Sequence, residues 1–176
     1  MILSNADKRE CAVNFQAFKF SHTLRVRWSE CDLQAIAYYA TYLTWAEIGF
    51  AEYCRNLGFS LYKLSGLNRF DTVTAKLVIE FKSSARLDDL IDIHVRLANI
   101  GRASLNFEFL LFRSIDTQVL ASIEATYVSY DNQKHESKPV PEEVRKIFTH
   151  FETTGEVRST QGIAFFAEVN SSGSGY

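Results

Sequence analysis

The sequence predicts an α+β fold in which a curved antiparallel sheet of about five strands wraps around one long central helix. Three observations support this prediction. One strand pattern precedes a single long helical pattern, the helical pattern is apolar around most of its circumference, and four long strand patterns follow it. Both prolines come after the last strand pattern, so none interrupts the sheet. A curved sheet gives such a helix apolar neighbours on most of its sides.

The first strand is expected at residues 22–28. Apolar residues alternate there, and Leu24, Val26 and Trp28 share one side, which indicates a half-buried strand. The chain of 176 residues is long enough for one domain with a substantial core. We expect that domain at residues 18–153, after an irregular leader at residues 1–17.

The central helix is expected from about residue 40 to residue 57. Its core-facing side chains recur at spacings of three and four residues and are Tyr42, Trp45, Ala46, Gly49, Tyr53 and Leu57. Ala46 and Gly49 are small, which permits close approach of a sheet. Gly58 is suited to end the helix. The segment that follows, residues 60–70, is expected to be a loop with room for a short helical turn.

The remaining strands are expected at residues 73–81, 90–100, 103–113 and 119–130. The breaks at residues 99–102 and 114–117 suit turns between antiparallel neighbours. Pro141 is expected to open a short C-terminal helix, because proline is favoured in the first helical turn. A partly flexible extension is expected at residues 154–176, with a strand or docking segment at residues 163–169.

Composition excludes several classes of function. The net charge of −2 offers no basic surface for a nucleic acid. The three cysteines show no disulfide framework, so reduced thiols and a cytoplasmic location are the default expectation. The four histidines lack partners at metal-ligand spacing, so neither a metal site nor a cofactor is expected. No segment is apolar for long enough to predict a signal peptide or a membrane span.

A candidate reactive group lies between the first strand and the helix. Asp32 follows the strand, and aromatic residues then lead into the helix start. An aspartate is ionised at neutral pH and is able to act as a nucleophile or as a general base. The N-terminus of a helix carries unpaired N–H groups and a partial positive charge, which suit a developing oxyanion. By itself, an aspartate before a helix is more often a cap or a loop residue.

Several motifs occur in a consistent order along the chain. The most specific are RVRWSECD at residues 25–32, IAYYA at 36–40 and YLTWAE at 42–47. Supporting motifs are FKSSARLDD at 81–89, GRAS at 101–104 and VPEEV at 140–144. With these motifs, residues 21–151 resemble the hotdog-fold thioesterases of the 4-hydroxybenzoyl-CoA thioesterase family. The resemblance implies a hotdog fold and hydrolysis of an acyl thioester of coenzyme A or of acyl carrier protein.

The resemblance also implies roles for single residues. Asp32 matches the catalytic carboxylate, acting as nucleophile or general base, and Tyr39 matches the helix start whose backbone N–H polarises the thioester carbonyl. The chain has Ala35 where the family often has glycine, and Thr41 where it often has asparagine. Alanine at this position predicts ordinary backbone angles, whereas glycine is free to adopt a positive φ.

Substrate-binding roles are expected for six further residues. Tyr38 and Tyr42 are expected in the pocket wall, and the 14 phenylalanines and 8 tyrosines of the chain make an apolar acyl pocket plausible. Glu47 is expected to be buried and either to pair with a basic residue or to add a second carboxylate to the site. Coenzyme A carries phosphates, and their first candidate is Arg102, followed by Lys82 and Arg86.

The family resemblance implies a symmetric homodimer with its sites at the interface, or a homotetramer, which would also cover the edge of the sheet. Two other functions stay open at this point. One is a hotdog hydratase or dehydratase, although the segment after Asp32 lacks the histidine that this chemistry normally uses. The other is a non-catalytic acyl-CoA-binding protein that kept the fold.

Overall fold

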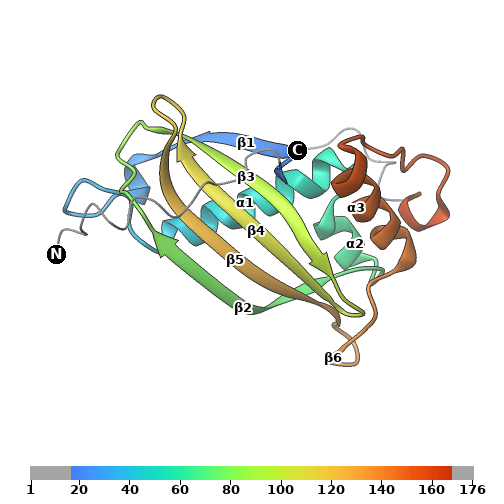
Figure 1. Ribbon diagram of the computed structural model, residues 1–176. Helices are drawn as coiled ribbons and strands as arrows, with labels where there is room; N and C mark the ends of the chain where they lie inside the picture. The colour runs from blue at the N-terminus through green and yellow to red at the C-terminus, as the bar shows by residue number, and fades with distance from the viewer. Residues whose placement is uncertain (1–16, 168–176) are drawn as a thin grey trace.

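The structure is a computed structural model that describes residues 17–167. An antiparallel sheet curls around the long helix α1 (Thr41–Asn56), which lies along its concave face (Figure 1). The strands are β1 (Phe20–Arg25), β2 (Thr72–Phe81), β3 (Leu90–Ile100), β4 (Ser104–Arg113), β5 (Gln118–Asp131) and the two-residue β6 (Glu136–Ser137). The expected leader, and the flexible tail at residues 171–175, lie almost wholly outside the described residues.

The sheet has the order β1-β3-β4-β5-β2, with β6 paired to β5. The expected strands at 73–81, 90–100, 103–113 and 119–130 are confirmed within one residue at each end. Alternation sets which side chains are buried, because successive residues of a strand point to opposite faces. On β4, for example, Leu105, Phe107 and Phe109 are buried in the core while Asn106 and Glu108 are more exposed.

The helix α1 packs closely on the sheet, as the small residues predicted. A Cβ atom added to Gly49 would lie 2.7 Å from Cγ2 of Ile93 on β3, so only glycine fits without movement. Trp45 and Tyr53 on the same side of α1 are fully buried. Gly58 has a φ of +85°, the left-handed conformation that ends many helices, and its predicted role is confirmed.

One expectation about this part of the chain was wrong. The strand β1 ends at Arg25 because the chain turns into a short 3-10 turn at Trp28–Glu30, and this turn leaves Trp28 82% exposed. The sheet curls around α1 as expected, and the side of the helix away from the sheet leaves Leu43, Thr44 and Glu47 exposed.

The helices α2 (Leu61–Gly66) and α3 (Glu142–Thr154) gather at the end of the molecule where α1 finishes (Figure 1). Pro141 is the N-cap of α3, as expected at the opening of that helix. The chain beyond α3 returns to this cluster, and the fully buried Phe166 contacts Phe59 with ring centroids 5.6 Å apart. The described part of the expected docking segment is therefore a docked 3-10 turn, Ala164–Phe166.

The loops fall into two groups at opposite ends of the sheet. The β1–α1, β2–β3 and β4–β5 connections meet at one end (Figure 1). The β3–β4 turn, α2 and α3 lie at the other end. Residues from the first group of loops are therefore able to form one site. No helix among residues 17–167 is both long and apolar enough to cross a bilayer.

Candidate active site

The loop that carries Asp32 is a small, closed hairpin. Cys31 and Ala37 pair across it, the Asp32 N–H donates to the carbonyl of Ile36 at 2.9 Å, and the Ala35 N–H donates to the Asp32 carbonyl at 3.0 Å. These bonds fix the backbone on both sides of the carboxylate. The loop therefore presents Asp32 from a defined position rather than from a free strand end.

Ala35 adopts a backbone conformation opposite to the one expected. Its φ is +59°, in the left-handed region that alanine avoids and glycine occupies without cost. The expectation of ordinary backbone angles at Ala35 was therefore wrong. The hairpin bonds impose this conformation, because they require the chain to turn back within four residues. The loop keeps the geometry that glycine would favour, at the cost of local strain.

The Asp32 carboxylate is held by one oxygen. Its Oδ1 accepts a hydrogen bond from the Gln34 N–H at 2.7 Å, which is the pattern of an Asx turn. Among the described residues, Oδ2 has no hydrogen-bond partner, and the side chain is partly exposed. One oxygen therefore orients the group, while the described residues leave the other without a hydrogen bond.

The N-terminus of α1 provides a partial positive charge, opposite in sign to the Asp32 carboxylate. The Tyr38 carbonyl accepts from the Thr41 N–H at 2.9 Å, which makes residues 38–41 the first turn leading into the helix. Within residues 17–167, the backbone N–H groups of Tyr39 and Ala40 donate to no acceptor. Unpaired N–H groups at a helix N-terminus bind anions and developing oxyanions.

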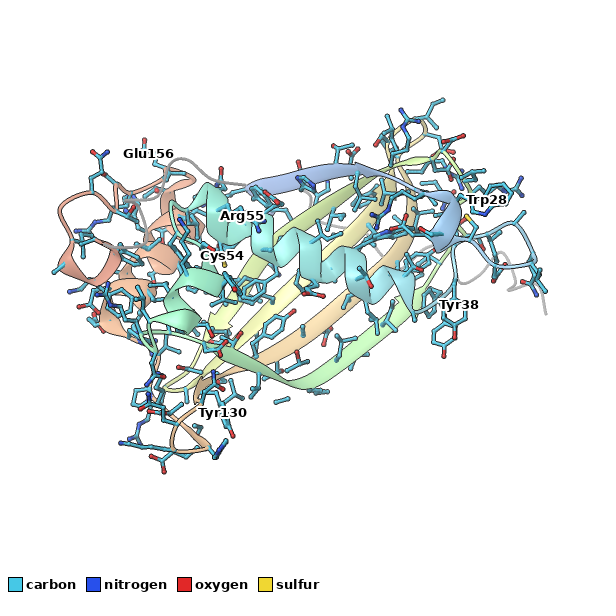
Figure 2. All side chains as sticks on the ribbon, turned by 180° about the vertical axis from the view of Figure 1, so that it is seen from behind. Trp28, Tyr38, Cys54, Arg55, Tyr130 and Glu156 are labelled. Atoms are coloured by element: carbon cyan, nitrogen blue, oxygen red, sulfur yellow. The ribbon has the colours of Figure 1, made fainter. Side chains whose placement is uncertain are left out.

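The carboxylate and the helix start open onto the same groove, which has a volume of about 420 Å³. Its lining includes Asp32, Ile36, Tyr38, Tyr39, Tyr42, Phe81, Lys82, Ser83 and Ser84. Figure 2 shows Tyr38 projecting away from the molecule at the same end as Trp28. The rings of Tyr38 and Tyr39 lie 4.5 Å apart, so two exposed aromatic rings flank the groove.

Backbone bonds join the Asp32 hairpin to the β2–β3 loop that forms the far wall of the groove. The Ala37 N–H donates to the Ala85 carbonyl at 2.9 Å, and the Ala85 N–H donates to the hydroxyl of Tyr42 at 3.0 Å. Burial raises the pKa of Tyr42, so this hydroxyl stays neutral at physiological pH. Tyr42 therefore connects α1 to the opposite wall, and its side chain lines the groove.

A second hollow, of about 490 Å³, adjoins the groove. Ser83 and Ser84 line both of them. The second hollow is lined by Arg86 and Arg113 together with Asp89 and Asp116. Arg113 is bound to both of these aspartates, at 3.1 and 2.9 Å, whereas the Arg86 side chain is exposed. The predicted cations Lys82 and Arg86 thus lie along one continuous path that begins beside Asp32.

Comparisons with known proteins decide the family. The model of the thioesterase-like superfamily matches residues 26–148, which contain the Asp32 hairpin, α1 and all strands after β1. The chain belongs to the thioesterase-like superfamily.

Known relatives agree with this assignment. The acyl-CoA thioesterase YbgC of Haemophilus influenzae is 29% identical over 131 residues, which cover 74% of this chain and 95% of YbgC. A 1,4-dihydroxy-2-naphthoyl-CoA thioesterase from Synechocystis has a similar fold, with a TM-score of 0.68 at 14% identity, covering 72% of this chain and 93% of that protein. Protein SAV2348 of Staphylococcus aureus, solved in complex with CoA, gives a TM-score of 0.70 at 16% identity, covering 80% of this chain and 87% of that one. These likenesses confirm the predicted hotdog fold.

Two predicted residues are not brought to the groove of this thioesterase-like chain. Arg102 follows β3, whose 11 residues separate it from the Asp32 end by about 30 Å. Within one chain Arg102 therefore lies at the end of the sheet opposite the groove. Glu47 is exposed on the outer side of α1, and no basic residue among the described ones pairs with it. Burial, and secondarily the charge of Glu47, raises the pKa of Tyr127 on β5 to about 12.

Glu30 is the residue at this site that the sequence analysis missed. It is 7% exposed, and its carboxylate binds Arg27 and the indole N–H of Trp45. The available signal was the spacing of three between Arg27 and Glu30, which allows an ion pair. Burial of the acid was not readable from that spacing, because Trp45 is 15 residues further along the chain.

The described residues show no cluster of three or more side chains suited to hold a metal ion. All four histidines lie within residues 17–167, and none lines the groove. The chemistry available in the groove is therefore that of one carboxylate, exposed tyrosines, serines, a lysine and the backbone N–H groups at the start of α1.

Proposed function

We propose that this chain hydrolyses acyl-CoA thioesters to a free carboxylic acid and the thiol of coenzyme A. One observation carries the proposal: the Asp32 carboxylate and the unpaired N–H of Tyr39 open onto the same groove. Thioester hydrolysis needs a nucleophile or base on one side of the carbonyl and a hydrogen-bond donor for its oxygen on the other. The names of the YbgC relatives support the same reaction.

The groove supports two routes to the same products. In the first, Asp32 removes a proton from water, and the hydroxide attacks the carbonyl carbon. In the second, Asp32 itself attacks, the thiolate leaves, and water then hydrolyses the mixed anhydride. In both routes the carbonyl oxygen gains negative charge, which the Tyr39 N–H and the positive end of α1 stabilise. The loss of one such donor typically slows a reaction by about 10²–10³-fold.

The groove walls suggest where the substrate lies. Tyr38, Tyr42 and Phe81 offer apolar surface for the acyl group beside Asp32. The path past Ser83 and Ser84 leads to Arg86, which is positioned for a phosphate of coenzyme A. Acyl carrier protein presents the same thioester on a phosphopantetheine arm, so it stands as the alternative carrier.

We also propose that the chain forms a homodimer. The strand β2 is an edge of the sheet and exposes Val73, Leu77, Val78 and Phe81 by 36–47%. Long apolar edge strands are normally covered, because their free N–H and C=O groups pair readily with other chains.

The alternative function is acyl-CoA binding without hydrolysis. The strained Ala35 is the specific observation that favours it, because it replaces the glycine that the family often has in the loop that carries Asp32. A hydratase or dehydratase is disfavoured because no histidine reaches the groove.

The test uses purified full-length protein with a panel of aromatic, short-chain and long-chain acyl-CoA thioesters and with acyl carrier protein thioesters, measuring release of free thiol. Hydrolysis by the wild type that disappears in Asp32→Ala supports the proposal. Undiminished hydrolysis by Asp32→Ala removes Asp32 from the mechanism. Tight binding of acyl-CoA without release of thiol by the wild type supports the binding function instead.

A further inference from the structure

We infer that Glu30 is a positioning residue for this reaction: its buried carboxylate holds the Asp32 hairpin and the N-terminus of α1 in a fixed relation. The inference rests on the proposed function, because it concerns the same carboxylate and the same helix start.

The Glu30 carboxylate accepts four hydrogen bonds from donors in two parts of the chain. Its Oε2 accepts from the backbone N–H of Arg27 at 2.7 Å. Its Oε1 accepts from the Arg27 guanidinium at 2.6 and 3.1 Å, and from Nε1 of Trp45 at 3.2 Å. Trp45 lies one turn into α1 and is fully buried. The carboxylate therefore bonds the segment before the hairpin to the first turns of the helix.

The backbone of the same residue makes the complementary connection. The Glu30 carbonyl accepts from the Tyr38 N–H at 2.8 Å and from the Thr41 hydroxyl at 3.3 Å. Tyr38 precedes the unpaired N–H of Tyr39, and Glu30 itself lies two residues before Asp32. Asp32 is thus two residues from Glu30, and Tyr39 is one residue from the Tyr38 N–H that Glu30 binds.

The charge of Glu30 matters for this arrangement. Burial raises its pKa, but the hydrogen bonds from Arg27 and Trp45 outweigh burial, and the pKa lies below its ordinary value. The group is therefore ionised at neutral pH and accepts all four bonds at once. A glutamine has one acceptor oxygen and an NH₂ group, which would face a donor and leave at least one of these bonds unmade.

A shift of the Asp32 hairpin relative to the N-terminus of α1 would lower the rate of hydrolysis rather than the affinity for the substrate. The acyl group and the coenzyme contact the groove walls, whereas the reaction depends on the distance from Asp32 and from the Tyr39 N–H to one carbonyl group. A displacement of about 1 Å at such a site can cost about 100-fold in rate. Neither Glu30 nor Arg27 lines the groove, so neither change removes a contact to the substrate.

The test compares Glu30→Gln with Tyr53→Phe, using steady-state hydrolysis and thermal unfolding. Tyr53→Phe is the matched control, because it also removes a hydrogen bond between α1 and a carboxylate, that of the partly buried Glu152, at the far end of the helix. We expect kcat of Glu30→Gln to fall by about 10- to 100-fold with KM changed less than threefold. Tyr53→Phe is expected to lose thermal stability and to keep its kcat.

A second variant keeps the test decisive if Glu30→Gln does not fold. Arg27→Gln removes the guanidinium, whose side chain is 65% exposed, and leaves the bonds from the Arg27 N–H and Trp45 intact. It is expected to fold and to lose kcat by a smaller factor. A kcat near the wild-type value in the folded variants, or an equal loss in Tyr53→Phe, would overturn the inference while leaving the thioesterase proposal standing. Absence of hydrolysis by the wild type overturns both, and that outcome is seen before any variant is measured.

Discussion

At the scale of single residues, Asp32 and its hairpin show how a small conformational detail sets the geometry of the candidate site. The pairing of Cys31 with Ala37 was not visible in the sequence, because neither residue type signals a bridge. The positive φ of Ala35 follows from that pairing rather than from its own preference. The identity of Asp32 as the candidate group was predictable, since its motif is local, whereas its conformation was not.

Ala35→Gly is expected to stabilise the protein by up to about 1 kcal/mol, because glycine adopts a φ of +59° without the steric cost that alanine pays. The measurement is chemical denaturation of both proteins. Ala40→Gly is the matched control, since Ala40 has a φ of −69° in the turn before the helix. Glycine relieves no strain there and only increases the conformational freedom of the unfolded chain, so this variant should lose stability. A lower stability for Ala35→Gly would contradict the strain described for the hairpin.

At the scale of elements, the close contact between α1 and the sheet was the most predictable feature. Apolar spacing located the helix, and the small residues Ala46 and Gly49 indicated the side that a sheet approaches. These are local signals, and the helix and four of the strands follow from them. The end of β1 was less predictable, because its alternation continues to Trp28 although the chain turns after Arg25.

Gly49→Ala is expected to destabilise the protein by about 1–3 kcal/mol, because the new methyl group would lie 2.7 Å from Cγ2 of Ile93, a stiff β-branched side chain. Urea unfolding followed by circular dichroism measures the change. Gly66→Ala on α2 is the control, since nothing lies within 4 Å of a Cβ atom there. Equal stability of Gly49→Ala and the wild type would show that the helix and sheet are less closely packed.

The stability that the contact between α3 and the core contributes should depend on pH. Burial raises the pKa of Glu152, although Tyr53 and the Leu97 N–H donate to its Oε1. A carboxyl with a raised folded pKa contributes stability that is full below its unfolded pKa and is lost as the pH rises through the folded pKa. Glu152→Gln keeps the acceptor oxygen and removes the charge, so we expect it to be more stable than the wild type at pH 8.

Unfolding of Glu152→Gln and the wild type between pH 4 and pH 8 checks this expectation. The two stability curves should converge at the acidic end and separate toward pH 8. A variant that is less stable than the wild type at pH 8 would mean that the ionised Glu152 contributes favourably to the fold.

At the scale of the whole molecule, the placement of loops decides which residues meet. The β1–α1 and β2–β3 connections, together with the first turn of α1, bring Asp32, Tyr39, Tyr42, Lys82 and Ser84 to one groove. The position of Arg102 could be read from the strand order, because Lys82 precedes β3 and Arg102 follows it, so the two lie at opposite ends of the sheet. The burial of Glu30, by contrast, depends on Trp45, a contact that only the folded chain makes.

The exposed edge of β2 leads to a prediction about assembly. Light scattering should give about 40 kDa, twice the 20.1 kDa of one chain, and Val78→Lys should shift the mass toward the monomer because it places a charge on the edge strand. Ile115→Lys, at a turn where the side chain is 89% exposed, should leave the mass unchanged. A monomeric wild type at micromolar concentration would contradict the homodimer.

The central claim is that Asp32 performs the chemistry and that the groove around it binds the thioester. The most direct test is the single-turnover rate of Asp32→Asn on the best acyl-CoA substrate, together with the affinity of the variant for that substrate. We expect a loss of about 10²–10⁴-fold in the rate with the affinity nearly unchanged, because the variant keeps the size of the side chain and removes its charge. A rate within tenfold of the wild type would contradict it.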